Sequence, residues 1–546
     1  MNTRANSASK QPPTANYDAV IVGAGFAGMY MLQRLRERGL AVRVLEAAAG
    51  VGGVWYWNRY PGARCDVESV EYQLNFSEEI QREWSWSERY ASQAEIMRYM
   101  NYLADRLDLR RDIQLETRVI AMTYDEPEAR WIVETDRGDR LCSHYCIMAT
   151  GCLSAAQVPD IPGLDSFQGE WYHTGEWPHD GVQFAGKSVA VIGTGSSGIQ
   201  SIPVIAMEAD ALYVFQRTPN FVLPANNRAL STDETQRSKD NFIEDRRRAH
   251  HSFGGTLGIF NEKTAHEMTE EQRARELEDR YRQGGFSYLM SFADLLTDNE
   301  ANECAARFIR KKIAEIVRDP QVAMTLTPVD HPIGTKRLCL DTNYLEAFNA
   351  PHVKLIDLRK APIDRIVANG LICGDREFEF DVIVFATGFD AMTGALLNID
   401  IHGRGGLSLR DRWAAGPRTY LGTGVAGFPN LFLIAGPGTP AVLTNTVVAI
   451  EQHVDWVADC IAYLRDRNIA TIEALPNAEE GWVDHVNEAA HMTLYPLANS
   501  WYMGANMPGK PRIFMPYVGG LSTFRKRCEA VAAKGYDGFL LRQGAR

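Results

Sequence analysis

Two glycine-rich loops, each lying between a strand-like apolar segment and a helical pattern, constrain the fold of this chain most strongly. The first loop spans residues 23–28 after the apolar segment 17–22, and the second spans 193–198 after the segment 187–192. Both match G-x-G-x-x-G, in which glycines permit a tight turn and let the backbone approach a pyrophosphate at a helix N-terminus. Because strand and helix context surround both loops, the sequence predicts two Rossmann-like βαβ units that each bind a dinucleotide.

The residues that end the second strand of each unit distinguish the two dinucleotides. In the first unit the strand 41–45 ends at Glu46, whose carboxylate can accept hydrogen bonds from both hydroxyls of an unphosphorylated ribose. In the second unit the strand 211–215 leads into Arg217 and Thr218. A guanidinium can bind a 2′-phosphate with two hydrogen bonds, whereas a carboxylate would repel it. We therefore expect NADPH in the second unit, with Lys336 as a further phosphate ligand.

The division of the chain follows from its length and from the pattern between the loops. A chain of 546 residues exceeds the size at which a single core keeps growing. Residues 226–330 lack strand alternation and show helical spacing of apolar residues, so they predict a helical insertion in the NADPH-binding domain. The predicted α/β fold has a disordered tail (1–16), an FAD-binding domain (17–155 and 386–546), an NADPH-binding domain (156–225 and 331–385) and the helical insertion (226–330).

Composition excludes several classes of function. A net charge of −12 argues against nucleic acid as a partner, because phosphate binding needs concentrated positive charge. No apolar run approaches the roughly 18 residues that span a bilayer. Nine cysteines without a CxxC pair favour a reducing cytoplasm, and Cys142 and Cys146 are predicted to be buried thiols. His485 and His491 do not share a helix face, so no metal site is predicted. We expect a soluble cytoplasmic protein that is a monomer or a weak dimer.

Two longer motifs carry a resemblance to a known family. Residues 167–178 (FQGEWYHTGEWP) match F-x-G-x-x-x-H-x-x-x-W, with Phe167, Gly169, His173 and Trp177 at the fixed positions. Residues 53–66 (GVWYWNRYPGARCD) match G-x-W-x-x-x-x-[FY]-P-[GM]-x-x-x-D. With the ATG triplets at 149–151 and 386–388, these motifs resemble the type I Baeyer–Villiger monooxygenases, which are class B flavin monooxygenases. The resemblance covers essentially residues 17–546 and is closest to the phenylacetone and steroid monooxygenase branch.

This resemblance implies a reaction and a pair of charged residues. The family uses FAD, NADPH and O2 to convert aryl, cyclic or steroid-like ketones into esters or lactones through a C4a-peroxyflavin and a tetrahedral adduct. The segment 334–337 (GTKR) is similar to the family segment that carries the active-site arginine, here Arg337, and Asp66 matches its carboxylate partner. An arginine suits this chemistry because it stays cationic and cannot protonate a peroxide anion. For His173 we predict a structural or conformational role rather than direct proton transfer.

The candidate residues fall into two further sets. The predicted cofactor-binding residues are Gly23, Gly25, Phe26, Ala27, Gly28, Glu46, Gly53, Val54, Trp55, Asp66, Tyr72, Gly193, Thr194, Gly195, Ser196, Ser197, Gly198, Arg217, Thr218, Lys336, Arg337 and Trp501. The resemblance implies a substrate pocket lined by Cys152, Leu153, Ala441, Val442, Leu443, Thr446 and Met515. Trp501 resembles a mobile-loop tryptophan that covers the nicotinamide, but a packed aromatic residue would give the same pattern.

Three alternative functions remain to be weighed against the ketone reaction. A class B monooxygenase that oxidises nitrogen or sulfur centres needs a protonated hydroperoxide, and an arginine beside the peroxide would oppose it. A pyridine-nucleotide–disulfide reductase needs a cysteine pair beside the flavin, and the sequence has no CxxC or CxxxxC motif. A flavoprotein that only senses NADPH or oxygen would not require Arg337 and Asp66.

Overall fold

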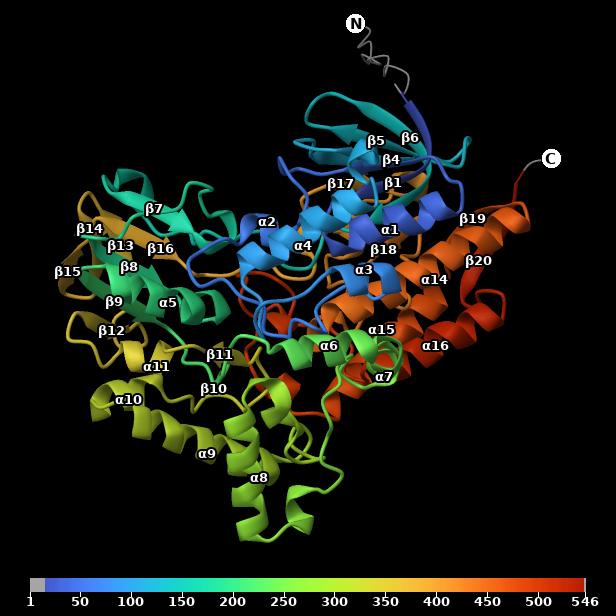
Figure 1. The fold of residues 1–546 in the computed structure, drawn as a ribbon. Coiled ribbons are helices and arrows are strands. Elements are labelled where there is room, and N and C mark those ends of the chain that lie inside the picture. The colour runs from blue at the N-terminus through green and yellow to red at the C-terminus, as the bar shows by residue number, and fades with distance from the viewer. Residues whose placement is uncertain (1–14, 545–546) are drawn as a thin grey trace, which may run out of the picture.

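The first glycine-rich loop lies in the middle of a large mixed sheet in a computed structural model that describes residues 15–544 (Figure 1). Strand β1 (Ala15–Val22) leads through this loop into helix α1 (Phe26–Glu37), and β2 (Val42–Leu45) follows. β1 lies between β2 and β6 (Arg140–Met148) and is parallel to both. β3 (Ile113–Gln114) extends the sheet beyond β2, and β18 (Leu431–Leu433) pairs with the end of β6. We call this part of the molecule the first unit.

The N-terminal strand is longer than the sequence predicts. Residues 1–14 of the predicted tail lie outside the described residues. Ala15 and Asn16, which we assigned to that tail, instead belong to β1 and pair with Leu141 and Cys142 of β6. The prediction was wrong at these two positions because polar residues at a strand end can still complete backbone pairing with a long neighbouring strand.

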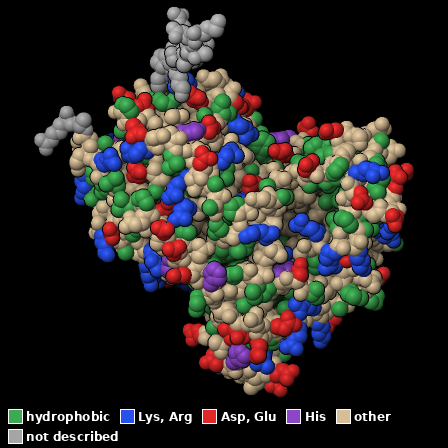
Figure 2. All heavy atoms as spheres, turned by 180° about the vertical axis from the view of Figure 1, so that it is seen from behind, with side chains coloured by type: hydrophobic (Ala, Val, Ile, Leu, Met, Phe, Trp, Pro, Cys, Tyr) green, Lys and Arg blue, Asp and Glu red, His purple; other side chains and the backbone are tan. Residues whose placement is uncertain are grey.

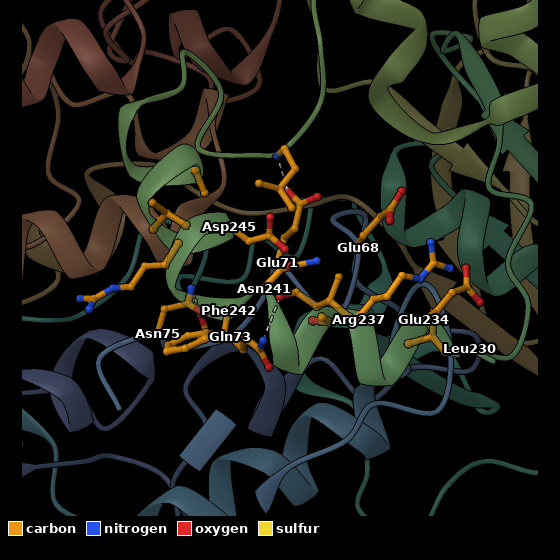
Figure 3. Close-up of a pocket in the computed structure, with 16 residues that line it drawn as sticks. Glu68, Glu71, Gln73, Asn75, Leu230, Glu234, Arg237, Asn241, Phe242 and Asp245 are labelled. Carbon is orange, nitrogen blue, oxygen red and sulfur yellow. Dashed lines mark hydrogen bonds between the residues drawn. The ribbon is translucent and has the colours of Figure 1, made fainter. Parts of the chain in front are cut away.

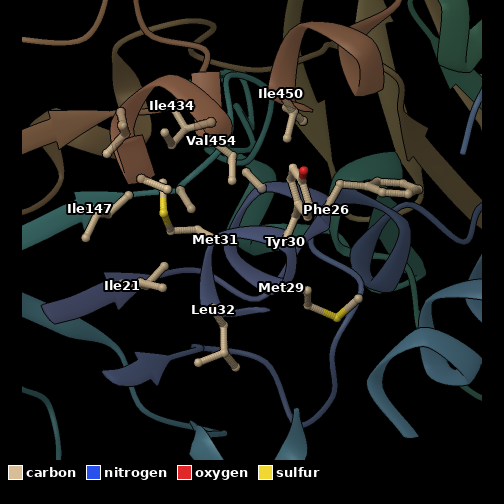
Figure 4. Close-up of a cluster of buried hydrophobic side chains, with 14 of the residues drawn as sticks. Ile21, Phe26, Met29, Tyr30, Met31, Leu32, Ile147, Ile434, Ile450 and Val454 are labelled. Atoms are coloured by element: carbon tan, nitrogen blue, oxygen red, sulfur yellow. The ribbon is translucent and has the colours of Figure 1, made fainter. Parts of the chain in front are cut away.

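Helix α1 is held against the sheet by a core that distant parts of the sequence supply. Met29, Met31 and Leu32 are almost fully buried, and α14 (Thr446–Asp466) packs on the same helix. Figure 4 shows Tyr30 and Met31 of α1 near Val454 of α14. The Tyr30 hydroxyl also donates to Asp455 at 2.8 Å. Burial of each large apolar side chain stabilises this arrangement by about 1.5–3 kcal/mol, so helix and glycine loop stay in register with the sheet.

The second glycine-rich loop lies in a smaller sheet whose strands are all parallel, in the order β12-β9-β8-β16-β7. β8 leads into α5, and β9 follows it as the second strand of the βαβ unit. The segment 167–178 supplies the edge strand β7, which pairs with β16. We call this part the second unit. Its strands and helix are β7 (Glu170–His173), β8 (Ser188–Ile192), α5 (Ser196–Glu208), β9 (Ala211–Gln216), β12 (Val353–Asp357) and β16 (Val382–Phe385).

Residues 226–330 contain helices and no strand among their described residues. α6 (Thr232–Asp240) and α7 (Phe242–His251) lie on the first unit, where α7 contacts α3 (Glu78–Glu83), α14 and α16 (Leu521–Ala533). The later helices lie below the second unit in Figure 1 and contact β10 and α11. They are α8 (Glu270–Gln283), α9 (Asn299–Ile316) and α10 (Pro320–Leu326). The helical segment therefore touches both units.

The remaining elements complete these layers. In the first unit, β4, β5 and β17 extend the sheet from β6, and β19 pairs with β20. In the second unit, β13, β14 and β15 form an antiparallel sheet, and β10 pairs with β11. Their bounds are α2 (Val54–Trp57), α4 (Gln93–Arg106), β4 (Val119–Asp125), β5 (Arg130–Thr135), β10 (Val222–Pro224), β11 (Cys339–Asp341), α11 (Tyr344–Ala347), β13 (Ile363–Val367), β14 (Gly370–Cys373), β15 (Arg376–Glu379), α12 (Gly394–Leu397), β17 (Asp400–His402), α13 (Leu409–Arg412), β19 (Ile469–Ala474), α15 (Pro476–His491) and β20 (Phe539–Gln543).

Two connections that lead between the sheets of the two units, which we call the crossovers, run side by side. The first follows β6 and the second follows β16. Gln157 N donates to Gly388 O at 3.0 Å, and Asp390 N donates to Ala155 O at 2.9 Å. The Thr387 hydroxyl donates to Gln157 O at 2.6 Å. The two connections are thus hydrogen bonded to each other where they leave the units. This arrangement supports our proposed domain boundaries near residues 155 and 386.

The surface carries charges of both signs. On the face shown in Figure 2, acidic and basic side chains are interspersed over both units rather than gathered by sign. Within residues 15–544, no helix combines the length and the apolar character needed to cross a bilayer.

Candidate functional site

The first glycine-rich loop forms a side-chain-free surface together with the Gly52–Gly53 doublet. A Cβ added to Gly53 would lie 2.9 Å from Gly25 Cα, and one on Gly28 would lie 1.8 Å from Gly23 O. Gly53 has φ +57° at the start of α2. Larger residues would therefore separate the two loops or strain the backbone. Because these glycines carry no side chains, backbone atoms of the two loops face the end of β2. A bound pyrophosphate can therefore approach the backbone closely.

Glu46 lies beside this loop at the end of β2. Its carboxylate accepts hydrogen bonds from Ala24 N at 2.6 Å and from Ala48 N at 2.8 Å. Burial raises the pKa of Glu46, while these backbone donors lower it. The carboxylate is thus held at the position where a dinucleotide ribose would lie in this type of unit, which fits FAD.

Three of the predicted cofactor-binding aromatic residues converge from separate segments. The Trp55 indole on α2 donates to the Tyr72 hydroxyl at 3.1 Å, and the two rings meet edge to face. Phe26, the first residue of α1, packs edge to face on Tyr72 with ring centroids 5.5 Å apart. Val54 begins α2, and Ala27 follows Phe26 in the buried first turn of α1. The structure therefore brings this predicted set together beside the first loop.

The second glycine-rich loop repeats this geometry. Gly193 has φ +113°, and a Cβ on Gly198 would lie 2.2 Å from Gly193 O. A Cβ on Gly195, the residue before α5, would meet no atom within 4 Å. The Thr194 hydroxyl donates to Thr218 O at 3.1 Å, which ties the loop to the end of β9. The open space at Gly195, next to Ser196 and Ser197 at the helix N-terminus, is suited to a phosphate.

Two cations, Arg217 and Lys336, lie near this second loop. Arg217 is exposed directly after β9, and neither Arg217 nor Lys336 makes an ion pair with any described residue. Burial lowers the pKa of Lys336, Asp330 raises it, and the charge of Arg217 lowers it further. The two positive charges are therefore close enough to repel each other. A bound phosphate between them would relieve this repulsion, which fits a 2′-phosphate.

Arg337 and Asp66 form a bidentate ion pair between the units. Arg337 Nε donates to one carboxylate oxygen at 2.8 Å and Nη2 donates to the other at 2.7 Å. Nη1 donates to Val442 O at 3.0 Å, and the Phe286 ring lies 4.9 Å from the guanidinium carbon. About 25% of each charged side chain is exposed. The guanidinium is thus fixed in its plane while part of it stays accessible.

The surroundings of Arg337 keep it cationic. Burial is the largest single effect and lowers its pKa, but the charge of Asp66, the hydrogen bonds to it and the nearby Tyr502 and Cys65 together raise it by more, so the net pKa lies above the usual arginine value. Tyr502 lies next to it: burial raises the pKa of Tyr502 to about 12, while the charge of Arg337 and a hydrogen bond with it act in the opposite direction. At neutral pH the site therefore presents a permanent positive charge beside a neutral phenol.

Most of the predicted substrate-pocket residues share one apolar cluster. Cys152, Leu153, Val442, Leu443 and Met515 pack there with Tyr502, Phe514 and Trp501. Burial raises the pKa of Cys152 to about 11, so its thiol is neutral. Ala441 does not belong to this cluster. Ala441 is fully buried in a separate cluster against α14, and the Thr446 hydroxyl donates back to Ala441 O at 2.9 Å.

The fixed positions of the 167–178 motif pack within the second unit, and His173 also contacts the second crossover. His173 is buried, its Nδ1 accepts a hydrogen bond from Gly175 N at 3.0 Å, and its ring meets Phe389 edge to face. Burial lowers the pKa of His173 to about 4, although the backbone of Gln157 and Gly388 raises it. A Cβ on Gly169 would lie 2.5 Å from Asp381 O beside the Phe167 ring, and Trp177 is buried against Phe184. These contacts accord with a structural role for a neutral imidazole.

Sequence reasoning missed two side chains that contact Arg337. Phe286 belongs to the helical segment, in the aromatic-rich run 286–292, where nothing in the sequence singles it out or indicates its partner. Tyr502 adjoins Trp501, and their ring centroids are 4.2 Å apart. Tyr502 could have been predicted from this neighbour, because a residue that directly follows a site residue in the sequence remains close to that site.

A cavity of about 320 Å³ lies apart from all of the predicted site residues, between segment 68–75 and helices α6 and α7 (Figure 3). Glu68, Glu71 and Asp245 face one another across it. The Glu71 carboxylate accepts from Leu257 N at 3.0 Å, and Asn445 donates to its carbonyl at 2.7 Å. Burial raises the pKa of Glu71 to about 8, and the charge of Glu68 raises it as well. The folded protein thus holds this carboxyl group protonated at neutral pH.

This shift predicts a pH dependence of stability. The unfolded Glu71 ionises near 4.5, whereas the folded one ionises near 8, so stability falls as pH rises between these values. We expect Glu71→Gln to raise stability at pH 8 by on the order of 4 kcal/mol and to change it by less than about 1 kcal/mol at pH 5, since about three units of pKa difference act at pH 8 and one unit is about 1.4 kcal/mol. Thermal unfolding at both pH values measures this. Glu234→Gln, in the same cavity, is the control; an equal gain there, or no gain for Glu71→Gln, contradicts the interpretation.

Among the described residues, one group of metal-capable side chains lies outside the site. His266, Asp294 and Asp298 have ligand atoms within 4.8 Å of one another. Asp298 accepts from the backbone N of Ala301 at 2.9 Å and caps α9, and Asp294 accepts from Ala265 N at 2.9 Å. Helix and turn capping therefore account for the placement of both carboxylates.

Two dinucleotide-binding units with an arginine–carboxylate pair between them define a flavin- and nicotinamide-dependent oxidoreductase. The family described as "Pyridine nucleotide-disulphide oxidoreductase" matches residues 20–253. All nine cysteines of this chain are free, however, and burial raises the pKa of Cys146, near Cys142, to about 12. Buried neutral thiols do not perform disulfide exchange, so the match reflects the shared nucleotide-binding unit.

Relatives that match nearly the whole chain narrow this class. Acetone monooxygenase (methyl acetate-forming) of Gordonia sp. strain TY-5 is 43% identical, with 97% of this chain and 99% of the relative covered. A Baeyer–Villiger monooxygenase of Pseudooceanicola batsensis is 41% identical (96% and 96%), and phenazine N-monooxygenase PhzNO1 of Lysobacter antibioticus is 40% identical (96% and 97%). The solved structure of oxidized steroid monooxygenase bound to NADP is 50% identical, with a TM-score of 0.93 over 97% of this chain and 100% of that one.

The chain therefore belongs to the Baeyer–Villiger monooxygenase family. It is an FAD-containing, NADPH-dependent monooxygenase. The two units described above are its FAD-binding and NADPH-binding domains.

Proposed function

We propose that this enzyme inserts oxygen beside the carbonyl of a ketone, giving an ester or lactone, with Arg337 and Asp66 as its charged catalytic pair. The single observation that carries this assignment is the guanidinium that Asp66, Val442 and Phe286 hold in place while about a quarter of its side chain remains exposed. A fixed cation at the junction of two dinucleotide domains is suited to stabilising negative charge that develops on oxygen.

Arg337 contributes by charge and orientation. FAD, when bound and reduced by NADPH, supplies the activation of O2. Of the five N–H donors of the guanidinium, two bind Asp66 and one binds Val442 O. The other two are not used by these bonds, and because about a quarter of the side chain is exposed they can bind an anionic oxygen. Because arginine stays protonated, it stabilises that anion without protonating it, an effect worth about 3–4 kcal/mol for one such donor.

Asp66 acts on the reaction through Arg337. Its two oxygens accept the parallel N–H groups of the guanidinium and fix the plane of that group. Lysine in place of Arg337 would bind Asp66 as a point charge, and burial could lower its pKa until it donated a proton. The bidentate geometry therefore supports arginine as the residue that the chemistry requires.

The structure also supports a nucleotide preference. Arg217 and Lys336 place two unpaired positive charges near the glycine loop of the NADPH-binding domain. Their repulsion in the absence of an anion would be relieved by a 2′-phosphate. We assign them to NADPH recognition, with Thr218 held at the same strand end by Thr194.

Oxidation at nitrogen is the second candidate, because one relative is named a phenazine N-monooxygenase. Attack by a nitrogen nucleophile needs a protonated oxidant, which a permanent cation disfavours. The geometry around Arg337 therefore favours the ketone reaction, with nitrogen or sulfur oxidation as a side activity. A sensor without oxygenase activity would have no use for a desolvated, oriented guanidinium.

The experiment that tests this function uses the FAD-loaded enzyme with NADPH, O2 and a panel of aryl, cyclic, linear and steroid ketones, plus a phenazine and a thioether. We expect products one oxygen atom heavier than the ketones, formed with NADPH consumption and identified by mass as esters or lactones. If every ketone yields hydrogen peroxide alone while the phenazine is oxidised, the nitrogen reaction replaces our proposal. If nothing on the panel is oxygenated, the oxygenase assignment itself fails.

We further propose a cytoplasmic monomer or weak dimer. All nine cysteines are free and seven of them are buried, which is typical of a reducing compartment. Light scattering during gel filtration measures the mass; a stable higher oligomer would refute the second part of this proposal.

A further inference from the structure

Residues 499–512, which we call the covering segment, lie on the apolar cluster without a long helix or strand of their own. Their regular structure is the short turn Trp501–Met503. Most of their backbone hydrogen bonds are local, such as Ala505 N to Ser500 O at 3.1 Å, and Met515 N, beyond the segment, donates to Tyr502 O at 2.9 Å. Local hydrogen bonds fix the shape of such a segment but not its position on the protein. Its position therefore depends on contacts with other parts of the chain.

Two side chains of the covering segment bind the second crossover. Asn506 Nδ2 donates to Phe389 O at 2.7 Å. Lys510 Nζ donates to Ala391 O at 2.7 Å and forms an ion pair with the Asp390 carboxylate. Among residues 15–544, these are the hydrogen bonds that join side chains of the covering segment to the rest of the protein, apart from the contact of Tyr502 with Arg337. The segment is therefore fixed to residues 389–391.

The ion pair is built into the protein rather than lying loosely on its surface. The Lys510 side chain is 12% exposed and that of Asp390 is 28% exposed. An added Cβ on Gly394 would lie 2.6 Å from Asp390 Cβ, so glycine at 394 leaves room for the carboxylate. The Asp390 backbone is held by Ala155 across the paired crossovers. Breaking the pair would leave a largely buried ammonium or carboxylate without its partner, which is costly.

The other end of the covering segment reaches the catalytic pair. Tyr502 packs in the same cluster as Ala391 and Met392, which follow Asp390 directly. Val442, whose carbonyl oxygen accepts a hydrogen bond from Arg337, belongs to the same cluster, and the Trp501 ring is tilted against that of Tyr502. Burial raises the pKa of the Tyr502 hydroxyl, and the charge of Arg337 acts on it in the opposite direction. The position of the covering segment on residues 389–391 thus sets where Tyr502 lies relative to the guanidinium.

We propose that Asp390, Lys510 and Asn506 are positioning residues that hold the covering segment in place, and with it Tyr502 against Arg337. By keeping this segment on the cluster they exclude water from the anionic oxygen atoms that Arg337 binds. Water would protonate these atoms and so remove their negative charge. The catalytic part of this proposal rests on the function proposed above, whereas the structural part does not.

Hydrogen exchange tests the structural part in the FAD-loaded enzyme without NADPH. Lys510→Met keeps the aliphatic stem and removes the ammonium, and Asp390→Asn keeps the shape and removes the charge. We expect amides of residues 500–507 to exchange about tenfold faster in either variant, which is the change that a loss of one good charged contact produces. Arg512→Met is the matched control, because Arg512 bonds to Asn499 within the segment. Unchanged exchange in both variants, or an equal increase in the control, overturns the proposal.

The coupling of NADPH oxidation to product tests the catalytic part. We expect both variants to divert several-fold more NADPH to hydrogen peroxide with an unchanged rate of flavin reduction. The double variant should be no worse than either single one, because the two residues act as a pair, and Lys510→Arg should restore most of the coupling. Additive losses, or a parallel fall in flavin reduction, refute the positioning role. If the wild-type enzyme makes no ester, the proposed function fails, while the exchange result still decides the structural claim.

Discussion

Replacing Arg337 with alanine is expected to lower ester formation at least about 100-fold while flavin reduction by NADPH stays within about threefold of the wild type. The loss follows from removing a fixed cation from the developing negative charge, and a single oxyanion donor is worth about 100- to 1,000-fold in rate. Hydride transfer to the flavin develops no such charge on a substrate oxygen. Anaerobic stopped-flow reduction and product yield in air measure the two steps separately.

Arg404→Ala provides the matched control for this experiment. Arg404 also pairs with a carboxylate, Glu473, and lies over an aromatic ring, Tyr124, with 28% of its side chain exposed. Any general loss of stability from deleting a paired arginine should appear in both variants, but the selective loss of ester should appear at Arg337 alone. Equal loss of reduction and oxygenation in Arg337→Ala would assign this residue to cofactor binding instead.

Arg217→Ala is expected to lower kcat/KM for NADPH by about 10- to 100-fold and to leave kcat/KM for NADH unchanged. A hydrogen bond to a charged group contributes about 1.5–3 kcal/mol, which corresponds to this range. Arg217 has no carboxylate partner among the described residues, so its deletion leaves no unpaired acid behind. Steady-state kinetics with both nucleotides measure the ratio.

Arg365→Ala controls for the loss of an exposed arginine in the same domain, because Arg365 lies on β13, away from the glycine loop. It should change neither value of kcat/KM. Lys336→Ala should shift the preference in the same direction as Arg217→Ala, and the two effects should not be additive if both side chains bind one phosphate. An unchanged preference in Arg217→Ala would refute the phosphate role.

The two dinucleotide units could be predicted because their signals are local. Each glycine loop, its flanking strands and the residue at the end of the second strand lie within a short stretch, so spacing alone defines the geometry. The confirmed class of fold rests on these stretches. The ion pair of Arg337 with Asp66 was expected only from the resemblance, since nothing local joins two residues so far apart in the sequence.

Long-range pairing accounts for what the sequence did not reveal. Residues 170–173 form a strand because β16 offers a free edge, and that partner lies on the far side of the helical segment. Ala15 and Asn16 extend β1 for the same reason. Ala441 was placed in the pocket by its neighbourhood in sequence, but the turn before α14 directs it into a separate core. The contact of Phe286 with Arg337 could not be predicted, because it depends on how the helices of residues 226–330 fold back onto the site.

The hydrogen-bonded crossovers have a consequence for how such an enzyme can be assembled and recombined. Because Asp390 N bonds to Ala155 O, the chain leaves the FAD-binding domain and returns to it at one point. The whole stretch between them is therefore a cassette with adjacent ends. A short loop could close the FAD-binding domain in its absence, and a cassette from a relative could be grafted at the same two positions. Such a chimera must preserve the face that α7 presents to α3, α14 and α16, because these contacts help to tie the helical segment back to its host.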